Sequence, residues 1–141
     1  MIEVNNTTKN VICRAKLRRL GQAFLDKHKL TNKTVSVAFV PSRKMTAINN
    51  TYRQKNKTTD VLSFLADQTD TDDYLGEIII DYNQIKKQAK ESKKKILDEL
   101  NFVLVHGLFH LLGYTDETEP RRQEMIRLAD KFLNYYYQKM V

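Results

Sequence analysis

The chain has 141 residues, of which 41% are hydrophobic and 29% are charged, and these ordinary values exclude disorder as the default. This length suits one folded unit, so we expect residues 1–141 to form a single domain. Lysine and arginine number 24 against 17 acidic residues, a net charge of +7. That charge favours a polyanionic partner, most commonly nucleic acid, although a solvated lysine-rich surface explains it equally well.

The compartment is indicated by one cysteine and by the lack of a targeting segment. Cys13 cannot form an internal disulfide, and it continues an apolar stripe with Leu17, Leu20 and Phe24, so we expect it to be buried. The N-terminus has no basic region followed by an apolar stretch, and no apolar run is long enough to cross a bilayer. We therefore expect a cytoplasmic protein that does not contact a membrane.

Hydrophobic periodicity predicts strands and helices in alternation. In chain order, we predict a strand over Ile2–Val4, a helix over Lys9–His28, a strand over Val35–Val40, a helix opened by Pro41 and Ser42, strands over Val61–Leu65 and Glu77–Asp81, and helices beginning near Tyr82, Ile96 and Pro120. The helix from Ile96 to Leu112 is apolar nearly all round, which places it centrally. This order of elements indicates an α+β domain, a small sheet covered by helices.

The segment from His106 to Asp116 carries the clearest chemical signal. His106 and His110 are four residues apart on the predicted central helix, so both rings project from one face and can share one zinc ion. Gly113 can adopt the left-handed conformation that ends a helix, which leaves Asp116 free to fold back toward the histidines. A lone histidine on an apolar helix is usually a satisfied core residue, but two at this spacing each need a partner, and a shared metal supplies one.

This spacing matches the metzincin motif H-E-x-x-H-x-x-G-x-x-H at every position except two. Gly107 stands where a protease has its general-base glutamate, and Asp116 stands at the third histidine. The missing glutamate argues against ordinary peptide hydrolysis. Three protein ligands leave the fourth position of zinc to water, as in catalytic sites.

A basic segment between the second predicted helix and the third strand is a candidate phosphate-binding site. It contains Arg53, Lys55 and Lys57, and the planar guanidinium of arginine suits phosphate oxygens. A solvated basic loop is an equal alternative.

Together these segments resemble the YbeY family of bacterial endoribonucleases. The resemblance is carried by three blocks: Asn50–Arg53 through Thr59–Phe64, Leu75–Ile80, and Val105–Gly107 through His110–Tyr114. It implies a four-stranded mixed sheet with about five helices and a zinc site on the central helix and the turn after it. It also implies a metal-dependent, single-strand-specific endoribonuclease. Such an enzyme matures the 3′ end of the small-subunit rRNA and takes part in ribosome quality control.

The resemblance also assigns roles to individual residues. His106 and His110 match the first two metal ligands, and Arg53 matches an arginine that contacts RNA phosphate. The implied partners are single-stranded RNA, rRNA and the small ribosomal subunit, with no DNA. The family's third histidine is replaced by Asp116. An anionic ligand makes the bound water less acidic and widens the metal choice from Zn²⁺ towards Mn²⁺ or Mg²⁺.

The resulting hypothesis is metal-assisted RNA cleavage. Arg53 stabilises charge on the phosphate, and Glu117 is a candidate general base. The lysine-rich helix after Tyr82, together with Arg121 and Arg122, attracts the RNA backbone. Two alternatives remain open: a non-catalytic ribosome- or RNA-binding protein with a structural zinc, and a zincin-type metalloprotease.

Overall fold

The computed structural model describes residues 1–53, 59–67 and 73–140. The elements in chain order are β1 (Ile2–Asn6), α1 (Arg14–Lys27), β2 (Thr34–Phe39), α2 (Ser42–Arg53), β3 (Val61–Leu65), β4 (Tyr74–Ile80), α3 (Tyr82–Glu91), α4 (Ile96–Leu111) and α5 (Glu119–Lys139). The strands form one sheet of order β1-β2-β4-β3, in which only the β3–β4 pair is antiparallel. The predicted α+β fold with a mixed four-stranded sheet and five helices is therefore confirmed over the described residues.

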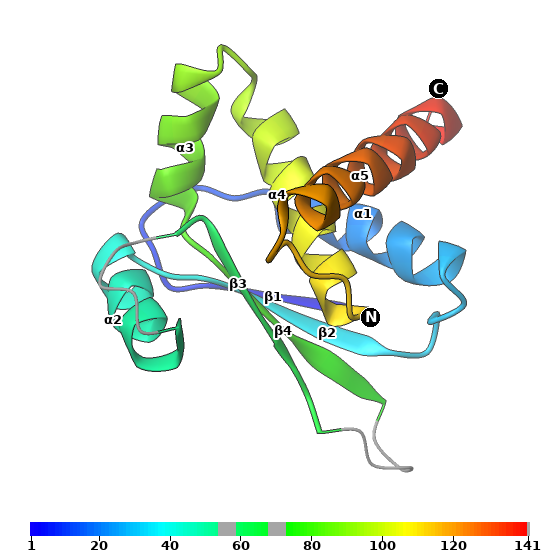
Figure 1. Cartoon of the computed structure of the whole chain (residues 1–141), viewed down its shortest axis with the longest axis horizontal. Coiled ribbons are helices and arrows are strands. Elements are labelled where there is room, and N and C mark those ends of the chain that lie inside the picture. The colour runs from blue at the N-terminus through cyan, green and yellow to red at the C-terminus, as the bar shows by residue number, and fades with distance from the viewer. Residues whose placement is uncertain (54–58, 68–72, 141) are drawn as a thin grey trace.

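The two faces of the sheet are covered unequally. In Figure 1, α1, α3, α4 and α5 lie on one side of the sheet, and α2 lies on the other. Because strand side chains alternate, Ile78 and Ile80 of β4 enter the large core under α1 and α4, whereas Ile79 joins a small cluster with Met45 of α2. Most of the core is thus on the side of the sheet that carries α4.

Helix α4 lies directly against the sheet, as its apolar sequence predicts. A Cβ atom at Gly107 would lie 3.1 Å from Cγ2 of Ile78 and 3.2 Å from Oγ of Ser63, so a larger residue would press on the strands. The Ser63 hydroxyl donates a hydrogen bond of 3.1 Å to the Gly107 carbonyl oxygen. These contacts fix the helix across β3 and β4.

Helix α1 begins later than the sequence predicts, at Arg14 instead of Lys9. The intervening backbone is held by side chains: Asn6 donates to the carbonyl oxygen of Asn10 at 2.7 Å and accepts from the N–H of Thr8 at 2.9 Å. Such local bonds compete with a helix. Cys13 therefore precedes the helix and is exposed, so the prediction that it is buried is wrong.

Strand β4 begins and ends earlier than predicted, at Tyr74 and Ile80. It ends before Asp81 because that residue caps the next helix. Its Oδ1 accepts from the backbone N–H of Gln84 at 3.1 Å and caps α3. None of the helices in the described ranges has the length and apolar character needed to cross a membrane.

Candidate metal centre

The candidate metal centre is built around the turn that ends α4. Gly113 has φ +100° and its N–H donates to the carbonyl oxygen of His110 at 3.0 Å, while the N–H of Tyr114 donates to that of Phe109 at 3.2 Å. This pair of bonds is a Schellman motif, and the edge-to-face contact between the rings of Tyr114 and Phe109 (centroids 5.5 Å apart) is the apolar contact that accompanies it. The turn predicted at Gly113 is confirmed.

The same turn sets the orientation and tautomer of His110. The backbone carbonyl of Tyr114 lies 3.0 Å from Nδ1 of His110. A carbonyl oxygen only accepts hydrogen bonds, so Nδ1 carries the hydrogen and the lone pair of the neutral ring is on Nε2. Nε2 is the atom that faces the other two candidate ligands.

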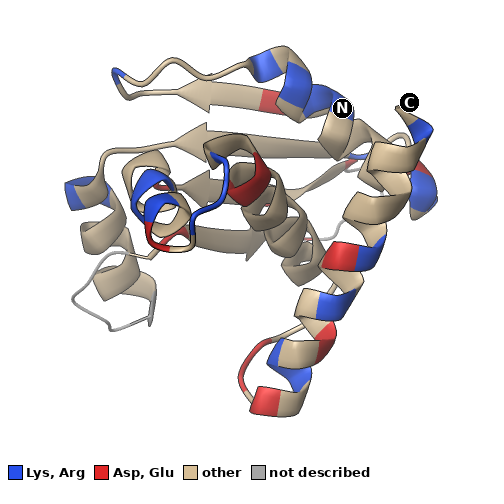
Figure 2. Ribbon diagram, turned by 90° about the horizontal axis from the view of Figure 1, so that it is seen from above, with Lys and Arg blue, Asp and Glu red and all other residues tan. Residues whose placement is uncertain are grey.

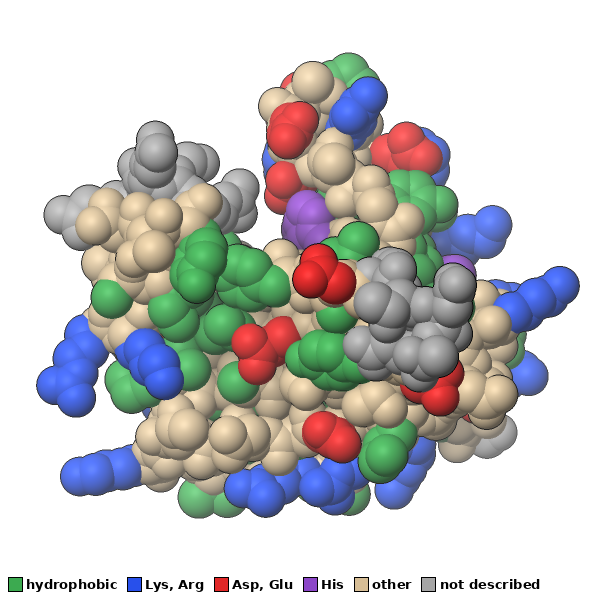
Figure 3. Space-filling model, turned by 90° about the horizontal axis from the view of Figure 1, so that it is seen from below, with side chains coloured by type: hydrophobic (Ala, Val, Ile, Leu, Met, Phe, Trp, Pro, Cys, Tyr) green, Lys and Arg blue, Asp and Glu red, His purple; other side chains and the backbone are tan. Residues whose placement is uncertain are grey.

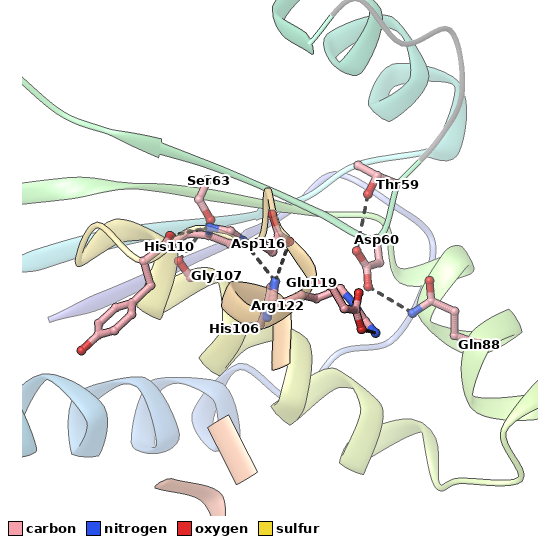
Figure 4. Close-up of polar contacts among 11 residues, drawn as sticks. Thr59, Asp60, Ser63, Gln88, His106, Gly107, His110, Asp116, Glu119 and Arg122 are labelled. Atoms are coloured by element: carbon pink, nitrogen blue, oxygen red, sulfur yellow. Dashed lines mark hydrogen bonds and ion pairs between the residues drawn. The ribbon is translucent and has the colours of Figure 1, made fainter. Parts of the chain in front are cut away.

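The ligand atoms of His106, His110 and Asp116 converge. The two Nε2 atoms are 3.1 Å apart, and Oδ2 of Asp116 lies 3.5 Å from each of them. Figure 4 shows the three side chains pointing toward one another, and their candidate ligand atoms lie within 4.8 Å of one another. The aspartate thus folds back under the histidines, and this set of two imidazoles and one carboxylate can hold a metal ion.

Burial keeps His106 in the form that binds a metal. Desolvation is the main cause that lowers the pKa of His106, and the neighbouring His110 lowers it further, against opposing effects of Asp116 and Asp60. Its Nδ1 is buried and has no hydrogen-bond partner among the described residues, and its ring stacks on Phe102. The neutral imidazole is the ligand form, so this environment fits a metal on Nε2.

Asp60 is a residue near the centre to which sequence reasoning gave no role. Its carboxylate accepts from Nε2 of Gln88 at 3.1 Å and from the hydroxyl of Thr59 at 3.5 Å (Figure 4). Its charge raises the pKa of His106, so it contributes to the electrostatics of the site. The only signal in the sequence was its place in the block Thr59–Phe64.

An open cavity of about 460 Å³ runs along β3 beside the cluster. β3 pairs only with β4 among the described strands, so its other edge is free. The cavity is lined by Tyr52, all five residues of β3, His110, Leu111, Gly113, Tyr114, Thr115, Asp116 and Glu117. Glu117 is thus among the lining residues, and its role as general base stays a prediction.

The predicted phosphate ligand Arg53 is the last residue of α2, and its side chain lies outside the described part of the structure, as do Lys55 and Lys57. The described basic residues are spread over several helices (Figure 2). Two of them have protein partners: Lys94 pairs with the nearby Glu99, and Lys86 donates to Asn10 of a distant segment.

The arginines at the start of α5 are also engaged locally. Arg121 donates to the hydroxyl of Thr115 at 3.3 Å, and Arg122 forms an ion pair of 2.8 Å with Glu119. Hydrogen bonds from Arg122 are the main cause that lowers the pKa of Glu119 to about 2. This exposed pair is close to the turn that carries Asp116, but neither partner lines the cavity.

The fold and the cluster define a small α+β protein with a His-His-Asp cluster that could hold a metal ion. The family model described as Endoribonuclease YbeY matches residues 2–137. The chain belongs to the YbeY endoribonuclease family, a family of hydrolases, and the resemblance noted in the sequence is confirmed.

Individual relatives agree with this assignment. An Endoribonuclease YbeY of Thermodesulfovibrio yellowstonii is 41% identical over 103 residues, covering 71% of this chain and 65% of that protein. One of Acholeplasma laidlawii is 41% identical over 102 residues, covering 72% and 74%. A solution structure of a Thermotoga maritima protein aligns with a TM-score of 0.61 at 22% identity, covering 99% of this chain and 93% of that chain, and so supports the fold.

Proposed function

We propose that this chain is a metal-dependent, single-strand-specific endoribonuclease that acts in the cytoplasm as one domain. Its proposed roles are maturation of the 3′ end of the small-subunit rRNA and ribosome quality control. The observation that carries the proposal is the convergence of His106, His110 and Asp116 beside an open cavity. The family assignment supplies RNA as the substrate class.

Zinc is the proposed metal, held by Nε2 of each histidine and by the carboxylate of Asp116. When bound, the metal supplies Lewis-acid activation of water and neutralises charge on the phosphate. His110 is fixed for this role by the carbonyl of Tyr114, and His106 by burial against Phe102. Asp116 partly cancels the charge of the cation, so Mn²⁺ or Mg²⁺ could also be accepted.

The remaining residues act on the RNA. Arg53 is proposed to stabilise the negative charge that develops on the phosphate. Glu117 lines the cavity beside the cluster and is the proposed proton acceptor for the attacking group. Replacement of Arg53 by Ala should reduce cleavage and leave the metal content unchanged.

The decisive test is cleavage of a labelled single-stranded RNA by the metal-loaded protein. We expect chelation and His110→Ala each to reduce the rate at least about 100-fold, because the metal no longer stabilises the transition state. His110→Ala should also lose bound metal, as measured by mass spectrometry of the native protein. His28→Ala is the matched control, because His28 contacts the rings of Phe24 and Phe109 but none of the three candidate ligands, and it should keep both metal and activity.

Other outcomes would favour the two alternatives. A folded, metal-containing protein that binds the small subunit but cleaves no RNA, alone or on the ribosome, would indicate a structural zinc in a binding protein. Hydrolysis of casein that is lost in His110→Ala would indicate a protease. Position 107 argues against the protease, since any side chain there would press on Ile78 and Ser63 of the sheet.

A further inference from the structure

An exposed apolar patch borders the metal centre. It consists of Tyr52, Phe64, Leu65 and Tyr114, which all line the cavity along β3. Tyr52 is 68% exposed, Leu65 57% and Tyr114 39%, which is unusual for large apolar side chains. Figure 3 shows hydrophobic side chains gathered over part of one face of the molecule, with acidic side chains among them.

The two tyrosine rings are held in place by other rings. Tyr52 of α2 packs against Phe64 of β3 with centroids 5.2 Å apart and planes at 67°. Tyr114 packs against Phe109 at 5.5 Å and 87°, within the Schellman motif. These contacts restrict the orientations of both rings, and both residues line the cavity, so less conformational entropy is lost when a flat ligand binds.

The charges among the described lining residues of the cavity are acidic. Asp116 and Glu117 are the charged residues among its described lining, and no lysine or arginine is among them. Phosphates are attracted by cations, so these described residues, apart from the metal position, are better suited to bases than to the RNA backbone. Aromatic rings bind the faces of nucleobases, and a volume of about 460 Å³ is in the range of small-molecule sites.

We propose that unpaired bases of the RNA substrate stack on Tyr52 and Tyr114, on two walls of the cavity next to the metal centre. The inference rests on the proposed endoribonuclease function and adds the physical basis of its strand preference. In a duplex the base faces are already covered by neighbouring pairs, whereas a single strand can turn its bases onto a protein ring. Stacking beside the ligands His110 and Asp116 selects single strands without reading sequence.

The experiment uses the metal-loaded full chain and a short single-stranded RNA that carries 2-aminopurine, whose fluorescence falls when it stacks. Rapid mixing records binding before cleavage. We expect Tyr52→Leu and Tyr114→Leu each to weaken binding about five- to 100-fold and to reduce the quenching, whereas Tyr52→Phe, which keeps the ring, stays within about twofold. The same RNA annealed to its complement should show no quenching with any of these proteins.

A matched control separates stacking from a general loss of an exposed tyrosine. Tyr137 is exposed to 37%, nearly as much as Tyr114, but lies on α5 away from the cavity lining. Tyr137→Leu should bind the RNA like the unmodified chain. Because its hydroxyl accepts a bond from Asn101, folding of this variant is checked by circular dichroism.

The outcomes distinguish this inference from the proposed function. Cleavage by the unmodified chain with equal binding by the Tyr52→Leu and Tyr114→Leu variants would overturn the stacking platform alone. Ring-dependent binding without any cleavage would support the platform and contradict the nuclease. A dimer in sedimentation that Tyr52→Leu dissociates would assign the patch to a second copy of the chain and overturn the proposal.

Discussion

Two sides of the same helix α4 have different roles: one packs into the core and the other carries candidate metal ligands. Leu100, Leu104 and Leu108, four residues apart, are at most 4% exposed and belong to the large core. His106 and His110 have the same spacing on another side of the helix, and their side chains are 14% and 24% exposed. One helical period thus provides both the packing that stabilises the protein and the ligands of the metal centre. Stability and metal binding should therefore be separable by mutation.

The largest effect on stability is expected on the leucine side of α4. Leu104→Ala removes a fully buried side chain from the core and should lower the free energy of unfolding by about 2–5 kcal/mol. Urea denaturation measures this loss, and the folded fraction should still bind one metal ion per chain. A variant of unchanged stability that had lost its metal would contradict the separation of the two sides.

An intermediate effect is expected at Gly113, where a substitution should change both the stability and the affinity for metal. A Cβ atom at this position would have no neighbour within 4 Å, so the cost of Gly113→Ala comes from φ +100° alone, about 1–2 kcal/mol. Because Tyr114 and Asp116 follow this turn, the affinity for metal should fall as well. Calorimetric titration with Zn²⁺ measures the affinity.

Gly113→Asn is the matched control, since asparagine tolerates the left-handed region better. It should lie between the parent chain and Gly113→Ala in both stability and metal affinity. Full metal affinity in the alanine variant would show that the turn does not position Asp116.

The smallest effect is expected from the titration of His106. Burial lowers its folded pKa below the ordinary value of 6.5, so the folded state resists protonation more than the unfolded state does. Protonation of His106 therefore favours the unfolded state. The free energy of unfolding of the metal-free protein should fall as pH decreases from 6.5 through the folded pKa of His106. Urea denaturation at about pH 7.5 and about pH 5.5 measures the slope, which should be shallower in His106→Gln. An identical slope in both proteins would show that His106 titrates normally.

Local patterns made the architecture and the ligand cluster predictable. The spacing of His106 and His110 is fixed by the helical period, and Gly113 marks a turn that only a few conformations satisfy. The start of α1 was mispredicted because apolar periodicity continues through Cys13, whereas the side chains of Asn6 and its neighbours hold the backbone in turns.

The tyrosine contact, the cavity and the position of Asp60 could not be predicted, because they depend on contacts between distant segments. Tyr52 meets Phe64 only because α2 packs on the sheet beside β3, and the cavity arises where that edge approaches the turn after α4. Asp60 is near His106 because β3 lies under the same helix. Periodicity within one element carries no information about such pairs.

The three candidate ligands all lie between positions 106 and 116, and this has a consequence for folding. A short loop joins them even in a denatured chain, so closing it costs little entropy and the unfolded ensemble keeps part of the affinity for metal. Ligand-linked stabilisation depends on the difference in affinity between the two states, and it is reduced by any binding to the unfolded chain. Metal should therefore raise the melting temperature by less than its native affinity alone implies.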